Sequence, residues 1–127
     1  MIVAGIGCKR GTPCDDIASL ILSVLATFAI ARERLGAIAT ESSKADEGGI
    51  VSAAQLLSVP LIRCPIADLD RIAHQVLTRS SRVEALKGVP SIAEASALVA
   101  AGRNARLLGP RVAAAKVTCA IAVGEGS

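Results

Sequence analysis

A glycine-rich segment near the amino terminus combines backbone and side-chain groups that could bind an anion. It consists of Gly7, Cys8, Lys9, Arg10, Gly11 and Thr12. Two cations beside the free N–H groups of a helix amino terminus attract a carboxylate or a phosphate. The segment lacks the Gly-Lys-Ser/Thr ending of a P-loop and the glycine spacing of a dinucleotide fingerprint. An anion-binding loop and a plain glycine-rich turn therefore both fit these residues.

A second polar segment carries the residue types of acid–base chemistry. It contains Ser43, Lys44, Asp46 and Glu47. A lysine beside two carboxylates can orient a carboxylate ligand or move a proton, so Lys44, Asp46 and Glu47 are the candidate catalytic residues. The structural alternative is that Asp46 caps a helix, Glu47 complements the helix dipole and Lys44 is solvated.

The thiol and imidazole side chains do not suggest a metal site. Cys8, Cys14, Cys64 and Cys119 form no Cys-x-x-Cys pair, and His74 is the only histidine. Zinc sites use clustered cysteine and histidine ligands, so we predict neither a metal nor another cofactor. The apolar content is high enough to fold without disulfides, and four free thiols are expected. His74 falls in an expected helix, where a surface position is the simplest interpretation.

Composition excludes several classes of protein. The chain has 127 residues, which suits a single domain over residues 1–127. Its net charge is only +3 and Phe28 is its only aromatic residue, so a surface that stacks nucleic-acid bases is excluded. The longest uncharged stretch, residues 17–31, is shorter than the roughly 20 residues that span a membrane. We expect a cytoplasmic protein that binds neither nucleic acid nor a membrane.

The elements that must position these residues alternate between strands and helices. Apolar runs predict strands at residues 1–6, 35–40 and 61–64, and helical spacing predicts helices over 12–34, 46–58 and 68–77. Thr12 is the expected N-cap of the first helix, with Pro13 as its first residue, and Asp46 that of the second. Residues 78–87 give no clear prediction.

The last third of the chain contains a helix followed by two strands. Ser91 and Glu94 match a capping box, which predicts a helix that ends at residue 101 before Gly102. The strands expected at 106–108 and 116–123 are joined by a short link and should form an antiparallel hairpin. The pattern predicts an α/β fold, a three-layer α/β/α sandwich whose mostly parallel sheet has about five strands. Residues 7–12 and 43–48 should then flank one crevice, beyond the carboxyl ends of adjacent strands.

Four motifs in order resemble one known family. They are Gly5-Ile6-Gly7-Cys8-Lys9-Arg10-Gly11-Thr12-Pro13, Lys44-Ala45-Asp46-Glu47-Gly48, Gly88-Val89-Pro90-Ser91-Ile92-Ala93-Glu94-Ala95 and Val117-Thr118-Cys119-Ala120-Ile121-Ala122. Together they resemble the carboxy-terminal domain of the cobalamin-biosynthesis protein CbiG and its stand-alone, CobE-like relatives. The resemblance implies an α/β/α domain with a place in corrin-ring synthesis. Arg111 replaces the lysine that is usual in the family, and residues 65–82 match it poorly.

The resemblance and the two polar segments together suggest an accessory protein that binds or transfers a corrinoid or precorrin intermediate. Lys9, Arg10 and Lys44 would bind the carboxylates of this ligand, and Asp46 and Glu47 would orient Lys44 or the loop. One alternative is a hydrolase or lyase acting on a lactone-bearing precorrin. Another is a partner protein without a ligand, which stabilises other enzymes of the pathway through the helix over 12–34.

Overall fold

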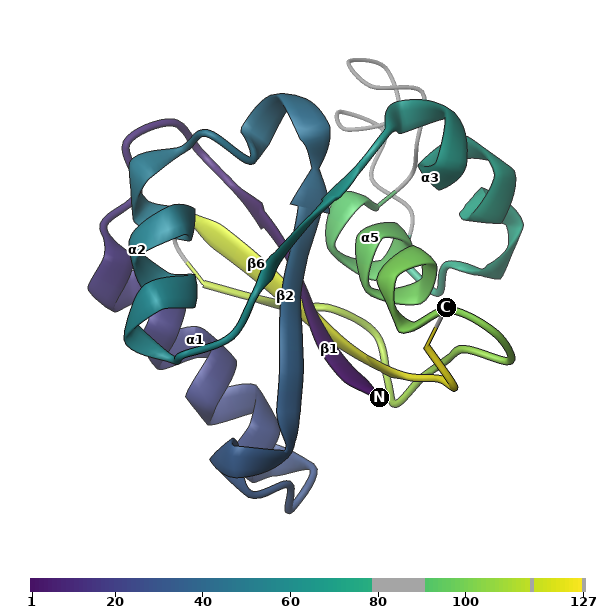
Figure 1. The fold of residues 1–127 in the computed structure, drawn as a ribbon, viewed down its shortest axis with the longest axis horizontal. Coiled ribbons are helices and arrows are strands. Elements are labelled where there is room, and N and C mark those ends of the chain that lie inside the picture. The colour runs from purple at the N-terminus through teal and green to yellow at the C-terminus, as the bar shows by residue number, and fades with distance from the viewer. Residues whose placement is uncertain (79–90, 115, 127) are drawn as a thin grey trace.

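The computed structural model describes residues 1–78, 91–114 and 116–126 and contains a six-stranded sheet (Figure 1). The strand order is β3-β2-β1-β6-β4, and β5 also pairs with β6. The strands are β1 (Ile2–Cys8), β2 (Leu35–Glu41), β3 (Leu61–Cys64), β4 (Arg106–Leu107), β5 (Val112–Ala113) and β6 (Val117–Val123). The strands expected at the start of the chain, at 35–40 and at 61–64 are all confirmed.

The direction of the strands also follows the prediction. β1, β2 and β3 are parallel, whereas β6 is antiparallel to β1, β4 and β5. Among the described strands, β6 alone therefore runs against the others. The antiparallel pairing of the two C-terminal strands is confirmed, but β5 was not predicted. β6 also pairs with β1 along its whole length, from Val123 opposite Ile2 to Val117 opposite Cys8.

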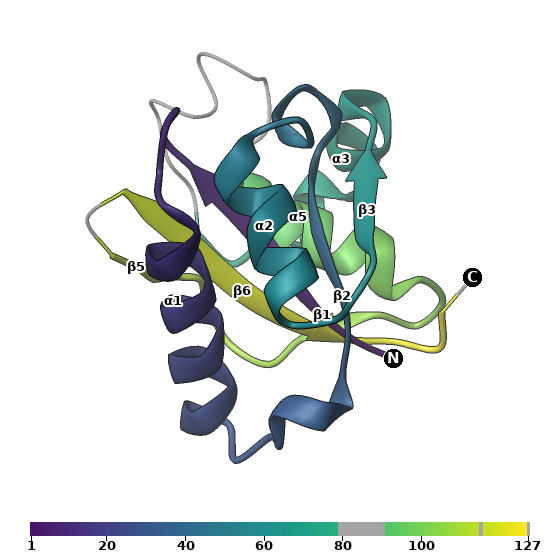
Figure 2. The ribbon, with the colours of Figure 1, turned by 60° about the vertical axis from the view of Figure 1, so that its left-hand side comes forward.

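The helices form two layers, one on each face of the sheet (Figure 2). One face is covered by α1 (Cys14–Thr27) and α2 (Gly48–Leu56), and the other by α3 (Ile66–Ile72) and α5 (Ile92–Ala101). Two separate apolar clusters fill the spaces between the layers. The α/β/α sandwich is confirmed.

The first helix is shorter at both ends than the sequence predicts. It ends at Thr27 rather than near residue 34, because Ala29 takes a left-handed conformation and Ile30 turns back to donate to the Leu25 carbonyl at 2.9 Å. A separate 3-10 turn, η1 (Arg32–Arg34), leads into β2. At the start, Pro13 and not Thr12 occupies the N-cap. The expected capping role of Thr12 is therefore wrong.

Two further helix boundaries differ from the prediction. Asp46 does not cap α2, because Glu47 occupies the N-cap and Asp46 forms an ion pair with Arg63 at 3.1 Å. α3 begins at Ile66, directly after Pro65, and continues beyond Ile72 as the 3-10 turn η3 (Ala73–Gln75). The helix expected over 68–77 therefore starts earlier and changes type at its end. Of the unassigned stretch 78–87, residues 79–87 lie outside the described residues.

Candidate functional site

The two polar segments singled out from the sequence lie side by side at the carboxyl ends of β1 and β2. The backbone N–H of Gly11 donates to the Glu47 carboxylate at 2.5 Å. A Cβ added to Gly49 would overlap the carbonyl oxygen of Thr12, so the backbones of the two segments are also in contact where α2 begins. The parallel pairing of β1 and β2 explains this proximity, because both strands end at the same edge of the sheet.

The first segment is a tight turn that leaves two cations in solvent. The Lys9 carbonyl accepts from the Thr12 hydroxyl at 2.6 Å and from the Thr12 N–H at 3.2 Å, and Gly11 has a positive φ of 77°. Thr12 is buried by these contacts, whereas Lys9 and Arg10 are exposed. Within the described residues neither cation forms an ion pair. The buried threonine therefore holds the turn, and the two cations can bind a ligand.

Gly7 and Cys8 form the half-buried base of this turn. The Gly7 carbonyl accepts from the Thr118 hydroxyl at 3.2 Å, which ties this end of β1 to β6. Burial raises the pKa of the Cys8 thiol, with a smaller raising effect from Glu47; nearby Lys44 and a hydrogen bond with Thr12 oppose these effects. Cys8 is therefore held as a neutral thiol next to Lys44 and Glu47, which is unfavourable for a nucleophile.

The second segment begins with a residue that the sequence analysis did not single out. Glu41, the last residue of β2, is buried, and its carboxylate accepts from the Ser43 N–H at 2.9 Å and from the Ser43 hydroxyl. These bonds shape the 3-10 turn η2 (Ser42–Lys44). Lys44 follows, half-buried and without an ion pair among the described residues. The available signal for Glu41 was a charged residue directly after the apolar run predicted as a strand over 35–40.

The three candidate catalytic residues do not form one acid–base group. The Glu47 carboxylate accepts a hydrogen bond from the Gly11 N–H, and the Asp46 carboxylate accepts one from Arg63 on β3. Lys44 lies close enough to Cys8 to affect the pKa of its thiol. Glu47 therefore joins the two loops, and Asp46 ties the second loop to β3.

A second buried carboxylate, Glu94 on α5, was assigned only a capping role from the sequence. Ser91 does cap α5, accepting from the Glu94 N–H at 3.3 Å. The Glu94 carboxylate instead accepts four bonds of 2.7 Å, from the Leu77 N–H, the Thr78 N–H and hydroxyl, and the Arg111 N–H. It is fully buried. Glu94 thus joins α5 to two distant segments, and the capping-box interpretation is wrong for this residue.

Several other expectations concern groups outside these two segments. His74 is exposed on η3, and all four cysteines are free thiols. Across residues 1–78, 91–114 and 116–126, no three histidine, cysteine, aspartate or glutamate side chains gather as metal ligands would. No helix in these ranges is long and apolar enough to cross a membrane.

Comparison with known proteins gives consistent matches over nearly the whole chain. The family model described as Cobalamin synthesis G C-terminus matches residues 2–122. Protein CobE of Sinorhizobium sp is 35% identical over 121 residues, which make up 95% of this chain and 79% of that protein.

Solved structures show the same similarity. A crystal structure of CobE, described as a protein from the cobalamin (vitamin B12) biosynthetic pathway, matches with a TM-score of 0.92 and 30% identity, covering 100% of this chain and 92% of that one. The cobalamin biosynthesis protein chiG from Agrobacterium tumefaciens str. C58 matches with a TM-score of 0.78 and 36% identity, covering 98% of this chain and 99% of that one.

Proposed function

Because the chain belongs to the Cobalamin synthesis G C-terminus family, we propose that it is an accessory protein of cobalamin biosynthesis that binds or transfers a corrinoid or precorrin intermediate. The family supports the pathway, since the similar proteins CobE and chiG are both named as cobalamin biosynthesis proteins. The ligand and its binding mode are the finer part of the proposal, and they rest on the geometry of the two loops.

One observation carries this part of the proposal: two loops joined by Glu47 present, at one edge of the sheet, three cations that form no ion pair with any residue the structure describes. These are Lys9, Arg10 and Lys44. Corrinoid intermediates carry several acetate and propionate side chains around one rigid ring, so they are spaced polyanions. Charge-assisted hydrogen bonds to such carboxylates contribute about 1.5–3 kcal/mol each. Lys44 should contribute most, because it is half-buried and salt screens it least.

The geometry supports binding better than hydrolysis or lyase chemistry. A general acid or base must reach the substrate with a free carboxyl or amine group. Glu47 already accepts the Gly11 N–H, and Asp46 is paired with Arg63. Lys44 then remains as a cation suited to holding a carboxylate.

The test is a titration with dicyano-cobyrinic acid, a coloured corrinoid whose side chains end in free carboxylates, followed by its absorbance and by gel filtration. We expect Lys9→Ala and Arg10→Ala each to weaken binding about tenfold and Lys44→Ala to weaken it more, up to about a hundredfold. Added salt should weaken binding by the parent protein. The full methyl ester of the same corrinoid should bind poorly.

Arg103→Ala is the matched control for loss of one positive charge. Arg103 is exposed, and its N–H donates to Gly126 near the termini, at the opposite end of β1 from the two loops. This variant should bind like the parent. If the parent protein does not bind the acid, or if Arg103→Ala weakens binding as much as the loop variants, the proposed site is wrong.

A further inference from the structure

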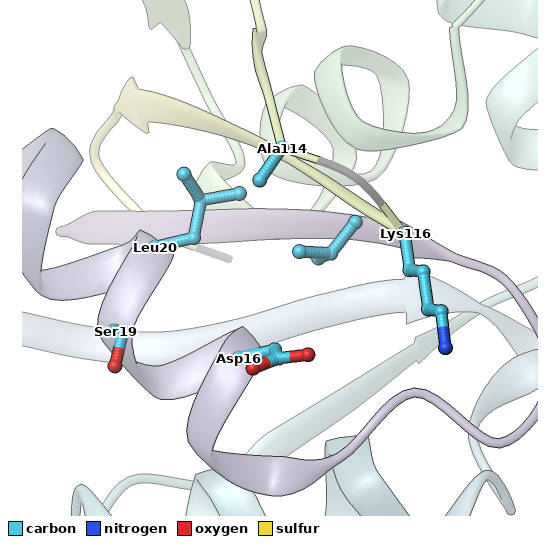
Figure 3. Close-up of a pocket in the computed structure, with 6 residues that line it drawn as sticks. Asp16, Ser19, Leu20, Ala114 and Lys116 are labelled. Carbon is cyan, nitrogen blue, oxygen red and sulfur yellow. The ribbon is translucent and has the colours of Figure 1, made fainter.

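A pocket lies next to the first loop, between α1 and the β5–β6 hairpin. It has a volume of about 380 Å³ and is lined by Asp16, Ser19, Leu20, Ala114, Lys116 and Val117. Figure 3 shows its two walls, with Asp16, Ser19 and Leu20 from α1 on one side and Ala114 and Lys116 on the other. Leu20 points toward Ala114 across the space. The pocket is therefore apolar in the middle, with charged groups at its edge.

Lys116 connects this pocket to the loop that carries Lys9 and Arg10. Its carbonyl accepts from the Lys9 N–H at 2.9 Å and from the Thr12 hydroxyl at 3.4 Å. The backbone of Lys116 is thus fixed against the turn, although nothing in the sequence analysis singled it out. Its side chain is exposed and makes no ion pair within the described residues, even though Asp16 lines the same pocket. Lys116 is therefore a further cation held next to Lys9 in the first loop.

The charges and the apolar surface define what the pocket can accept. Leu20, Ala114 and Val117 offer contacts to methyl groups and methylenes. Lys116 can bind a carboxylate, whereas Asp16 repels one. A suitable ligand therefore has an apolar rim with a carboxylate at one side, directed toward Lys116 and away from Asp16. The periphery of a corrinoid has this character, since methyl groups and carboxylate side chains alternate around it.

We propose that the binding site extends across Lys116 into this pocket, which takes one methyl-bearing edge of the corrinoid and its adjacent carboxylate. This inference rests on the proposed function and adds a second contact region to it. The loops would bind carboxylates on one part of the ring, and the pocket would fix which edge of the ring faces α1. The pocket would then determine orientation, whereas the loops supply much of the charge.

Charge variants of the pocket have opposite expected effects. With dicyano-cobyrinic acid as the probe, Lys116→Ala should weaken binding about tenfold, because one charge-assisted bond is lost. Asp16→Asn should tighten binding two- to threefold, because a repelling carboxylate is removed. Asp15→Asn is the matched control: Asp15 is the neighbouring exposed residue in the same first turn of α1 but does not line the pocket. It should change binding much less.

A steric test separates occupancy of the pocket from long-range charge. Ala114 is exposed and lines the pocket, so Ala114→Trp should fill it and weaken binding about tenfold. Ala113 is also exposed but does not line it, and Ala113→Trp should leave binding unchanged. Circular dichroism and thermal melts establish that each variant is folded.

The outcomes distinguish this inference from the proposed function. If the parent protein fails to bind the acid, the proposed function fails and this inference fails with it. If the parent binds and the loop variants weaken binding, but Lys116→Ala, Asp16→Asn and Ala114→Trp all bind like the parent, only the extension into the pocket is wrong. Equal effects of Ala113→Trp and Ala114→Trp would also overturn it.

Discussion

The two faces of the sheet are packed in different ways. The α1–α2 face is filled by large aliphatic side chains such as Ile6, Ile17, Ile21, Leu25 and Ile38. The α5 face is built mainly from small residues, including Ala37, Ala39, Ala95, Ala97 and Ala101. On the first face side chains keep the helices away from the sheet, whereas on the second the helix backbone itself comes close to it.

Glycine in β1 permits the close approach of α5. A Cβ added to Gly5 would overlap the Ala93 carbonyl oxygen and would lie 2.7 Å from the Ala97 nitrogen and 2.8 Å from its Cβ. Backbone atoms cannot rotate away as side chains do. The α5 face therefore has little room to adjust, and it also holds Glu94, which joins α5 to residues 77, 78 and 111.

The largest expected effect is that of Gly5→Ala, which adds a single carbon to the α5 face. Because the new methyl group meets backbone atoms of α5, the helix must move away from β1 or the strand must bend. We expect the free energy of unfolding to fall by about 3 kcal/mol or more, measured by urea denaturation.

Gly48→Ala is the control for adding a methyl group to a glycine. A Cβ at Gly48, the first residue of α2, meets nothing within 4 Å, and alanine favours a helix over glycine. This variant should be as stable as the parent or slightly more so. A Gly5→Ala protein with the stability of Gly48→Ala would show that the α5 face is not tightly packed.

The second prediction concerns Glu94→Gln on the same face. All described partners of the Glu94 carboxylate donate to it, and three of the four donors are backbone N–H groups that cannot reverse their role. A glutamine would direct an amide donor toward one of these donors, most directly at Arg111. The free energy of unfolding should fall by roughly 1–3 kcal/mol.

Glu47→Gln provides the comparison for Glu94→Gln. Glu47 is half-buried, and among the described residues its side chain accepts one hydrogen bond, from the Gly11 N–H, which the oxygen of a glutamine can still accept. Its loss of stability should be well under 1 kcal/mol. If the two variants lose equal stability, Glu94 does not hold the α5 face together as described.

The contrast between the faces also explains what the sequence could predict. Strands β1, β2, β3 and β6 are apolar runs whose type and position are set locally, and they were predicted correctly. β5 is only Val112–Ala113, too short to show an alternating pattern, and it exists because β6 offers it a partner. The C-terminal end of α1 was predicted wrongly because the alanines around it favour a helix. In the structure, the Ile30 N–H donates to the Leu25 carbonyl and the helix ends before it.

In the candidate site, too, features set by local sequence were predictable and features set by distant partners were not. The proximity of the two loops followed from the parallel order of β1 and β2, which the alternating pattern indicates. The role of Glu94 could not be predicted in this way. A capping box is a local pattern, whereas the partners of the Glu94 carboxylate, such as Thr78 and Arg111, are distant in sequence. Lys116 was missed for the same reason, since its contact with Lys9 depends on β6 returning beside β1.

A conservative substitution on the α1–α2 face should have a smaller effect than Gly5→Ala. Ile21 is fully buried in the aliphatic cluster, and Ile21→Val removes one carbon from it. Such a change costs about 0.5–1.5 kcal/mol, because neighbouring side chains relax into part of the space. Urea denaturation of both variants gives the comparison directly. A loss for Ile21→Val as large as that for Gly5→Ala would mean that the two faces resist change equally.

The smallest perturbation leaves the sequence unchanged and uses one buried thiol on each face as a probe. Cys64 lies in the α5-side cluster and Cys119 in the α1-side cluster. Burial raises the pKa of Cys119 to about 12; burial, with Asp68 and Glu41 nearby, raises that of Cys64 to about 11. At pH 8 both thiols are therefore protonated in the folded protein, and alkylation requires the structure to open.

We expect Cys64 to be alkylated before Cys119. Cys64 ends β3, a strand of 4 residues that, among the described strands, pairs only with β2. Cys119 lies in β6, between β1 and β5. An edge strand opens at a lower free energy than a central one. Pulsed iodoacetamide labelling with mass spectrometry should show the half-buried Cys8 and Cys14 first, then Cys64, then Cys119. Raising the pH to 10 should speed the labelling of both thiols without changing their order, because burial no longer raises the pKa of either thiol once the structure has opened. Equal rates for Cys64 and Cys119 at both pH values would mean that the two faces open only together, so that their different packing does not divide the domain into parts of unequal stability.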